Sequence, residues 1–329
     1  MIAIALLGAG RIGQIHGRNI AASPKARLAA IADPFPDGAK ALSAATGAPI
    51  KTPDEIFADK GIDAVLIGTP TDTHADFIDQ AAAAGKAVFC EKPVDLSSNR
   101  IRETLKRVEK SGIPLMIGFN RRFDPNFAAL QKRLADGEAG KVELVTILSR
   151  DPAPPPVSYI ERSGGLYRDM MIHDFDMARF LLGEEVAEVY AIGSALVDPA
   201  IGEAGDVDTA AVLLKTKSGK ICQISNSRRA TYGYDQRIEV HGSKGMLSAG
   251  NMHETTVRFA GGNGIVADKV QHFFLERYAA AYRHEVEAFI DAVVGGKKLS
   301  PSGIDGLQAQ ILADAATESS QTGKPVKIG

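Results

Sequence analysis

Five short, nearly continuous apolar runs lie within the first 120 residues, and helical patterns separate them. The runs are "IAIALLG", "RLAAIAD", "AVLIGTP", "AVFCEKP" and "PLMIGFN". Strands that read this way are usually buried on both faces of a sheet. Helical patterns occupy Ile12–Ala22, Thr73–Ala84 and Ser97–Lys110 between them. This alternation predicts an α/β fold with a parallel, doubly wound Rossmann sheet.

The pattern changes after about residue 121. A helix is expected over Asp124–Ala135, followed by a long strand, "KVELVTILSR". Two later segments fold back about "KSGK" and "GSKG", which are hairpin signals without an intervening helix. We therefore expect a domain over residues 1–120 and an α+β domain over 121–329 with an open, mostly antiparallel sheet. Helices over Glu276–Val294 and Gly303–Ser320 should end the chain, and the last could pack on the first domain.

The segment "LLGAGRIGQIH" follows the first strand and opens a helix, and it contains G-x-G-x-x-G at Gly8, Gly10 and Gly13. The first glycine permits a tight turn, the second lets the backbone approach a pyrophosphate, and the third allows close packing of helix on strand. The helix N-terminus, with Arg11 and Ile12, favours an anion. The strand–turn–helix context makes this a dinucleotide-binding signal.

Asp33 ends the second strand, twenty residues after Gly13. An acidic residue at this distance binds the ribose 2′-hydroxyl, and its charge repels a 2′-phosphate. No arginine follows in "DPFPDGAK" to accept such a phosphate. The predicted cofactor is therefore NAD, although Asp33 could instead only start a turn before Pro34.

Polar residues follow the third and fourth strands, in "GTPTDTHADF" and "EKPVDL". Open α/β sheets bind ligands at these carboxyl ends. The candidates for cofactor contact there are Thr69, Pro70, Thr71, His74, Glu91 and Lys92. Lys92 precedes a proline at the expected ligand edge, where it could also donate to a substrate oxygen, and His74 could instead be a local helix-start residue.

The segment "GGLYRDMMIHDFDMARFLLG", Gly164 to Gly183, reads as a single apolar helix that carries Asp169, His173 and Asp176. Residues at these intervals of four and three share one helix face. Isolated buried charges are costly, so a partner or a cavity is needed. For Asp176, a salt bridge to Arg179 or to a neighbouring loop is an equal alternative. We expect no metal: although His173, Asp174 and Asp176 have suitable side chains, Asp174 points about 100° away from His173.

Composition excludes several classes of protein. The formal net charge is −2, which offers no basic surface for nucleic acid or anionic membranes. No run approaches the roughly 18 apolar residues of a membrane span. The two cysteines, Cys90 and Cys222, form no metal-type or redox pair, which is typical of a cytoplasmic protein.

Taken together, these residues resemble the glucose–fructose oxidoreductase/inositol dehydrogenase/rhizopine-catabolism (Gfo/Idh/MocA) family. "GAGRIGQIH", Asp33, "EKP" and the segment with Asp169 and His173 match its hallmarks in order, over essentially the whole chain. The segments "GFNRRFDPNF", "SRDPAPPP" and "SGGLYRDMMIHDFDMARFLLGEE" are most similar to the bacterial inositol 2-dehydrogenase branch.

The resemblance implies a catalytic set of Lys92, Asp169 and His173. In that scheme His173 takes the hydroxyl proton while the nicotinamide accepts a hydride, Lys92 stabilises the oxygen and Asp169 hydrogen-bonds the substrate or positions the base. The implied reaction is NAD-dependent oxidation of a cyclic polyol, myo-inositol to 2-keto-myo-inositol. The alternatives are scyllo-inositol or an aldose with NAD or NADP, and a non-catalytic regulator that senses cofactor or sugar.

A polyol needs many directional donors and acceptors. Candidates for the substrate wall are Asn120, Arg121, Arg122, Asp169, His173, Asp176, Tyr232 and Tyr234, with Asp235 beside them. The two arginines could instead form a structural ion pair with Asp124. Apolar residues on the uncovered sheet face, as in "AAVLLKTKSG", indicate an interface. Together with the resemblance, this predicts a homotetramer.

Overall fold

The computed structural model describes residues 1–329 with the exception of Glu161, and it contains two compact units. Unit 1 comprises Met1–Phe123 and Ala281–Gln310, and unit 2 comprises Asp124–Ala280 and Ile311–Gly329. The chain therefore leaves unit 1, builds unit 2, returns to unit 1 and ends in unit 2. The expected division into domains of residues 1–120 and 121–329 stays a prediction. The two compact units are each made of two separate stretches of the chain.

Unit 1 is a five-stranded parallel sheet in the order β2-β1-β3-β4-β5. Its strands are β1 (Ile2–Leu7), β2 (Ala26–Ala32), β3 (Ala64–Ile67), β4 (Ala87–Glu91) and β5 (Leu115–Gly118). All six residues of β1 are buried, as expected for a central strand covered on both faces. The expected parallel, doubly wound sheet is confirmed.

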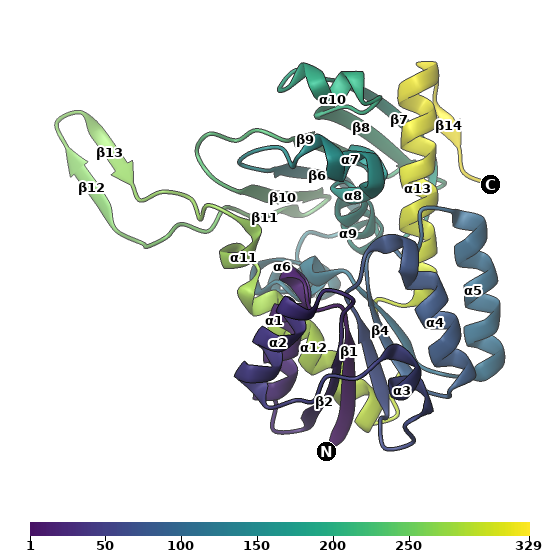
Figure 1. Ribbon diagram of the computed structural model, residues 1–329. Coiled ribbons are helices and arrows are strands. Elements are labelled where there is room, and N and C mark those ends of the chain that lie inside the picture. Colours follow the sequence, from purple (N-terminus) through teal and green to yellow (C-terminus); the bar gives the residue numbers. More distant parts are fainter. The chain divides into compact units, whose positions relative to one another are not determined.

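Helices cover both faces of this sheet (Figure 1). On one side lie α1 (Arg11–Ala22), α2 (Pro36–Thr46) and α12 (Ala279–Val294), and on the other α4 (His74–Ala83) and α5 (Ser98–Ser111). Val286, Phe289 and Ile290 of α12 belong to the same apolar core as Ile4 and Leu6 of β1. A helix from far along the chain thus completes the sandwich of the first unit.

Several short elements of unit 1 have clear local causes. Thr52 and Glu55 form a capping box at α3 (Pro53–Ala58), and Ser97 caps α5. The 3₁₀ turns η1 (Thr71–Thr73) and η2 (Asn120–Phe123) follow β3 and β5. Both turns lie at the carboxyl ends of parallel strands, where the cofactor residues were expected.

Unit 2 is built on a seven-stranded sheet in the order β11-β10-β6-β9-β8-β7-β14. Only the β6–β9 pair is parallel, and the other pairs are antiparallel. The strands are β6 (Val142–Arg150), β7 (Val186–Ser194), β8 (Thr209–Thr216), β9 (Ile221–Ser227), β10 (Asp235–Gly242), β11 (Gly245–Ala249) and β14 (Val326–Lys327). The expected open, mostly antiparallel sheet and both hairpins are confirmed.

One face of the second sheet is covered. Helix α9 (Ile172–Leu182) packs on β6 and β9. The end of α13 (Gly303–Thr322) is tied to β7, because Ser319 Oγ accepts a hydrogen bond of 2.9 Å from the Ala191 N–H. On the other face Ile192, Leu213 and Ile221 are exposed. This unit therefore presents a partly apolar sheet surface.

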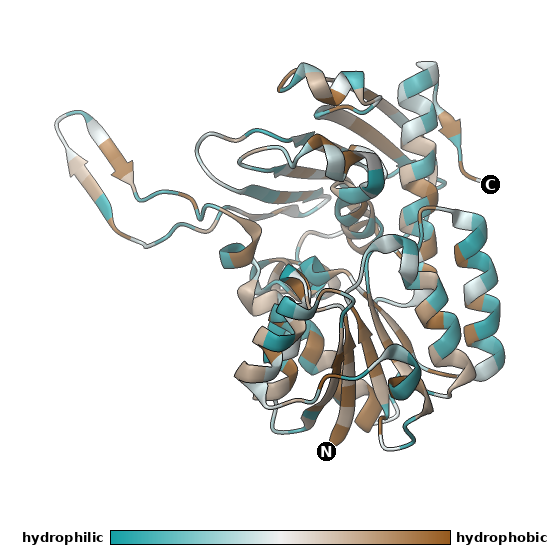
Figure 2. Cartoon of the chain, viewed as in Figure 1, coloured by the Kyte–Doolittle hydropathy of each residue, from teal (hydrophilic) through white to brown (hydrophobic). Residues whose placement is uncertain are grey.

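A two-stranded hairpin, β12 (Arg258–Gly261) and β13 (Gly264–Ala267), projects from unit 2, and sequence analysis did not anticipate it (Figure 1). Apolar segments are visible along it in Figure 2. Phe259, Ile265 and Val266 are exposed on it by 66–71%. Apolar side chains on this hairpin are therefore exposed to solvent and not packed in a core.

Two expected helices are in fact broken. The Gly164–Gly183 segment forms α8 (Gly165–Asp169) and α9, because the Leu166 carbonyl accepts from the N–H groups of both Met170 and Met171. The register therefore slips by one residue between Asp169 and His173, and the expectation of one continuous helix is wrong. Likewise, α11 (Phe274–Arg277) ends at Tyr278 before α12 begins.

The last helix, α13, contributes to both units. Its first residues belong to unit 1, where Gly303 faces Leu105 and Leu115 so closely that a Cβ would lie 2.3 Å from Leu105. The residues after Gln310 belong to unit 2. No helix in the described part of the chain has both the length and the apolar character needed to cross a membrane.

Candidate cofactor and catalytic sites

The three motif glycines of unit 1 have three different surroundings. Gly8 has φ +93°, and a Cβ on it would lie 2.6 Å from the Gly68 backbone. A Cβ on Gly13 would lie 2.0 Å from the Gly8 carbonyl oxygen. A Cβ on Gly10, by contrast, would meet nothing within 4 Å. Gly8 and Gly13 therefore permit the close packing of loop, strand and helix, whereas Gly10 leaves open space beside the backbone.

That open space lies at the N-terminus of α1. Gly10 is the N-cap residue, and no side chain caps the helix or places a carboxylate in its first turn. The N–H groups of a helix N-terminus attract a phosphate. Arg11 is exposed and Ile12 is half-buried beside this turn. The loop thus has the shape and the polarity that the pyrophosphate of a dinucleotide requires.

Asp33 lies against the same loop. Its Oδ2 accepts a hydrogen bond of 2.5 Å from the Ala9 N–H, and its Oδ1 accepts one of 2.7 Å from Phe35 N–H. The carboxylate is half-buried and fixed at the end of β2, next to the glycines. A carboxylate in this position can accept from a ribose hydroxyl and disfavours a 2′-phosphate. These residues of unit 1 fit NAD.

His74 joins two loops of unit 1: the loop after β3, which contains Thr69, and the loop after β4, which contains Pro93. The His74 ring is 1% exposed, and its Nδ1 and Nε2 lie 2.7 Å and 2.8 Å from the carbonyl oxygens of Pro93 and Thr69. Burial lowers the pKa of His74, and the two carbonyl contacts oppose part of that effect. His74 holds the two loops together, and its direct contact with the cofactor stays a prediction.

Around this histidine, the Thr69 loop remains accessible. Pro70 is exposed and Thr71 half-buried, and Thr73 Oγ1 contacts Thr69 Oγ1 at 2.7 Å. Glu91 is the last residue of β4 and Lys92 follows it, and both are half-buried. The backbone N–H of Lys92 donates to Glu91 Oε2 at 3.3 Å. Both edges expected to contact the cofactor thus lie at the carboxyl ends of the parallel strands.

The residues after β5 are more buried than a substrate wall would suggest. Asn120 and Arg121 are 2% and 3% exposed. Arg122 donates to Asp305 Oδ1 at 3.0 Å. Burial alone would raise the pKa of Asp305, but Arg122 and the Ser302 donors outweigh it and lower that pKa to about 2. Arg122 therefore has a structural ion pair within unit 1, and the partner is Asp305.

Asp124, considered above as a possible partner of the arginines, has other contacts in unit 2. It caps α6 (Pro125–Ala135) by accepting from the Asn126 and Phe127 N–H groups. It also pairs with the buried Arg277. This carboxylate is therefore structural, and the expected helix after it is confirmed.

The polar residues of α8 and α9 in unit 2 fall into two groups. Asp169 and His173 are half-buried. The Tyr159 hydroxyl donates to Asp169 Oδ1 at 3.0 Å, and Arg228 Nη2 lies 3.9 Å from Asp169 Oδ2. Asp169 is thus fixed by two neighbours while remaining accessible, which is suitable for a group that positions substrate or base.

Asp174 and Asp176, by contrast, are completely buried. Asp174 accepts from Ser149 Oγ at 2.6 Å and from Asn226 Nδ2 at 3.0 Å, which are side chains of β6 and β9. These bonds satisfy the carboxylate and dock α9 on the sheet. Asp176 is buried, and its contact with substrate stays a prediction.

The expected tyrosines of unit 2 differ from each other. Tyr232 is 48% exposed, donates to Asp235 Oδ2 at 2.6 Å and accepts from Arg150. Tyr234 is buried and packs edge-on against Phe273 and Tyr278. Tyr232 is therefore the more accessible candidate, while the ring of Tyr234 contributes to the core.

Sequence analysis missed Arg228, which is 1% exposed and lies 3.9 Å from Asp169 and 4.0 Å from Asp206. Asp206 in turn accepts from the Leu166 N–H at the start of α8. The adjacent arginines in "SRRA" gave no periodic signal that could have separated a buried from an exposed side chain.

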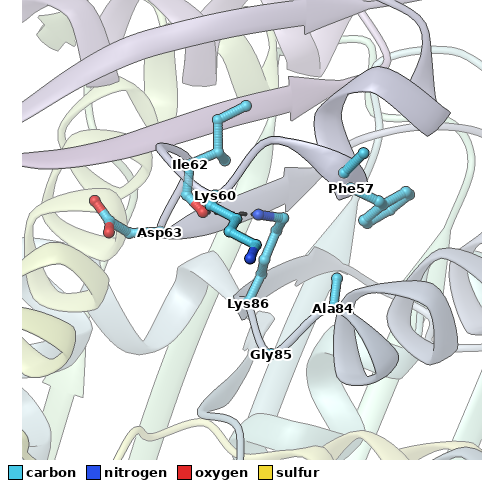
Figure 3. A pocket seen from close by; sticks show the side chains of 8 residues that line it. Phe57, Lys60, Ile62, Asp63, Ala84, Gly85 and Lys86 are labelled. Carbon is cyan, nitrogen blue, oxygen red and sulfur yellow. Dashed lines mark hydrogen bonds between the residues drawn. The ribbon is translucent and has the colours of Figure 1, made fainter.

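A pocket of about 560 Å³ also lies in unit 1, but at the opposite ends of the strands (Figure 3). Ile62 and Asp63 precede β3, and Lys86 precedes β4. The Lys86 ammonium donates to the Asp59 and Ile62 carbonyls at 2.7 Å and 2.8 Å. These bonds stabilise the turns, and the pocket is remote from the glycine loop.

Comparison with known proteins agrees with this geometry. Residues 2–119 match the model of the oxidoreductase family with the NAD-binding Rossmann fold, and residues 131–328 match that of its C-terminal alpha/beta domain. The chain is 55% identical over 323 residues to an inositol 2-dehydrogenase of Rhizobium meliloti (strain 1021), with 98% of each chain covered.

Two further relatives cover nearly all of the chain. A myo-inositol 2-dehydrogenase of Thermotoga maritima is 46% identical, with 99% of this chain and 98% of that protein covered. The crystal structure of a myo-inositol dehydrogenase from Corynebacterium glutamicum ATCC 13032 superposes with a TM-score of 0.96 at 46% identity, covering 100% and 99% of the two chains. With an NAD-binding loop in its first unit and a matching second unit, the chain is a member of the Gfo/Idh/MocA family of oxidoreductases.

Proposed function

We propose that the protein is an inositol 2-dehydrogenase that oxidises myo-inositol to 2-keto-myo-inositol with NAD. The observation that carries this proposal is a glycine loop in unit 1 that fits NAD. In unit 2, an accessible Asp169 is held in place by its neighbours, and His173 follows it four residues later in the sequence. The high identity to inositol dehydrogenases supports the substrate. NAD, when bound, supplies the hydride acceptor.

We propose Lys92, Asp169 and His173 as the catalytic set. His173 accepts the proton of the reacting hydroxyl, because an imidazole titrates near the working pH. Lys92 donates to the same oxygen and stabilises its developing negative charge. Asp169, which Tyr159 and Arg228 hold in place, orients a substrate hydroxyl or the imidazole.

For the polyol itself, the wall candidates stay those named from the sequence. Among them Tyr232 offers an accessible hydroxyl that is already polarised by Asp235 and Arg150. A polyol is recognised by several such directional groups, and a site built for hydroxyls rejects analogues that lack them.

The test is to incubate the protein with NAD and a panel of myo-inositol, scyllo-inositol and aldoses while following absorbance of the reduced cofactor. We expect turnover, with myo-inositol preferred. Preference for another polyol would correct the substrate only. Binding of NAD without turnover of any polyol would instead identify a sensor on the same fold.

We also propose a homotetramer. The uncovered sheet face of unit 2 carries Ile192, Leu213, Ile221 and Met246 at 43–55% exposure, and the β12–β13 hairpin adds a second apolar surface. Two different surfaces are what a tetramer built from dimers requires. Leu213→Glu should yield smaller species by light scattering, whereas Val294→Glu, on an exposed site of unit 1, should not. A monomeric wild type would refute the proposal.

A cytoplasmic location completes the proposal. Cys90 and Cys222 are both free and fully buried, and burial raises the pKa of each thiol. Unpaired cysteines are typical of a reducing compartment.

A further inference from the structure

Three titratable side chains meet in the interior of unit 1, beneath the cofactor loops. They are His16 of α1, Glu91 at the end of β4 and Glu285 of α12, and their ligating atoms lie within 4.8 Å of one another. His16 Nε2 lies 2.7 Å from Glu91 Oε1 and 3.9 Å from Glu285 Oε1. The side chains of His16 and Glu285 are completely buried, and that of Glu91 is 12% exposed.

Glu285 is the unusual member of this cluster. Neither of its carboxyl oxygens has a hydrogen-bond partner, although the side chain is fully buried. Its neighbour His16 lies among aromatic rings, because the His16 ring packs edge-on against Phe89 and Tyr282. An ionised carboxylate without partners in such a place would be very costly. Burial, and next the charge of Glu91, raise the pKa of Glu285 well above its ordinary value.

A metal ion could also neutralise such a cluster, but the histidine does not fit that use. Its Nε2 already has a 2.7 Å partner in Glu91. Its Nδ1 has no hydrogen-bond partner. Metal-ligating histidines almost always donate their second N–H to a carboxylate, carbonyl or water. A proton on Glu285 requires neither a free ring nitrogen on His16 nor a hydrogen-bond partner for the other ring nitrogen.

We propose that Glu285 is a positioning residue of the cofactor unit: a neutral carboxylic acid that supports the His16–Glu91 pair and so keeps the Glu91–Lys92 segment in place. The titratable groups beside Glu285 are His16 from α1 and Glu91 from β4. Tyr282, three residues earlier on α12, packs on the His16 ring. None of these groups donates a hydrogen bond from a positively charged atom to Glu285.

The link to the reaction runs through Glu91. One of its oxygens binds His16, and the other accepts from the Lys92 N–H at 3.3 Å. Its carboxyl group also packs on Gly118, where a Cβ would come within 3.1 Å. A movement of the Glu91 side chain would therefore disturb the hydrogen bond that it accepts from the Lys92 N–H. This part of the inference rests on the proposed role of Lys92 in catalysis, whereas the protonation of Glu285 does not.

The protonation is tested by thermal and denaturant unfolding of Glu285→Gln and wild type between pH 5 and pH 8. The glutamine mimics the neutral acid but releases no proton on unfolding. The unfolded wild type loses that proton above the ordinary pKa of a glutamate, about 4.3. The unfolding constant of wild type relative to Glu285→Gln should therefore already be several-fold above its low-pH value at pH 5 and rise by up to about tenfold per pH unit above it.

Glu287→Gln is the matched control, because Glu287 is on the same helix but half-exposed in an ion pair with Arg283. Its unfolding constant should follow wild type at every pH. A parallel pH dependence of Glu285→Gln and wild type would overturn the neutral-acid assignment. So would stabilisation of wild type, but not of Glu285→Gln, by Zn²⁺ or Mn²⁺, which would assign the cluster to a metal.

Positioning is tested with Glu285→Ala beside Glu285→Gln. A displaced Lys92 should lower kcat of the alanine variant by about 10- to 100-fold. The glutamine variant should retain wild-type kcat, because its amide keeps the shape and a donor. Equal kcat in folded Glu285→Ala and wild type would refute positioning. If no polyol is turned over by wild type, the proposed function fails, yet the unfolding profiles and the NADH affinity of the alanine variant still decide this inference.

Discussion

Separate replacement of Gly10 and Gly13 by alanine should divide cofactor binding from folding. Both glycines belong to one motif, yet a Cβ on Gly10 meets nothing within 4 Å, while a Cβ on Gly13 lies 2.0 Å from the Gly8 carbonyl oxygen. Gly10 has φ −69°, which alanine also adopts. The same one-methyl change therefore has different physical consequences at two positions three residues apart.

At Gly13 the methyl group overlaps with backbone that has little room to move. The contact is more than an ångström too short, and the Gly8 turn is itself packed against Gly68. Overpacking of this kind costs about 1–3 kcal/mol, and the rigid partner places Gly13→Ala at the upper end. A loss of about 3 kcal/mol would lower the melting temperature of a chain of 329 residues by roughly 4 °C.

At Gly10 the methyl group occupies the space through which a pyrophosphate reaches the α1 N-terminus. Hydrogen bonds to a charged group contribute about 1.5–3 kcal/mol, so Gly10→Ala should weaken NADH binding by roughly 10- to 150-fold. Its melting temperature without cofactor should equal that of wild type.

The assays are a fluorescence titration with NADH and a melting curve for each variant. The reasoning would be refuted if Gly10→Ala bound NADH like wild type, or if Gly13→Ala melted like wild type. Either result would mean that the cofactor loop does not have the packing described above.

Three further predictions concern single side chains. His173→Asn should lower kcat by at least about 100-fold with NAD affinity little changed, while the exposed His272→Asn should not; near-wild-type turnover would remove His173 from the mechanism. Asp33→Ser should reduce the preference for NAD over NADP, measured as the ratio of kcat/KM values, and tight NADP binding by wild type would contradict the role of Asp33. The pKa of Asp305, lowered to about 2, should give Asp305→Asn a lower unfolding free energy than wild type at pH 7. This difference should disappear as the pH falls from about 4 to 2, because the native ion pair favours the ionised form; a constant difference in denaturant titrations would contradict it.

Local sequence signals predicted the cofactor loop well, because each requirement is met within a few residues. Gly8, Gly10 and Gly13 lie between one strand and one helix, and their roles follow from steric limits on the backbone. The buried strands were equally clear, since parallel strands are apolar on both faces. Such features depend little on distant parts of the chain.

Features that depend on distant residues could not be predicted in this way. The break between α8 and α9 follows a turn in which Asp206, forty residues away, binds the Leu166 N–H. Glu285 meets Glu91 only because the chain returns to unit 1 after building unit 2. The periodicity of α12 shows that Glu285 is on a helix, but not that its carboxyl group faces another carboxyl.

The carboxylates of the Gly164–Gly183 segment illustrate how burial separates structural from functional roles. Sequence spacing grouped Asp169, His173 and Asp176, whereas the structure leaves Asp169 and His173 accessible and buries Asp174 and Asp176 completely. Asp174 is fully buried yet satisfied by Ser149 and Asn226, so its charge docks α9 on the sheet. A side chain that must exchange a proton with substrate needs access, which Asp169 and His173 both have. Of the two, His173 carries the imidazole, the group most often used as a general base. The register slip at Met170 and Met171 then matters for the proposed mechanism, because it sets the position of Asp169 relative to His173.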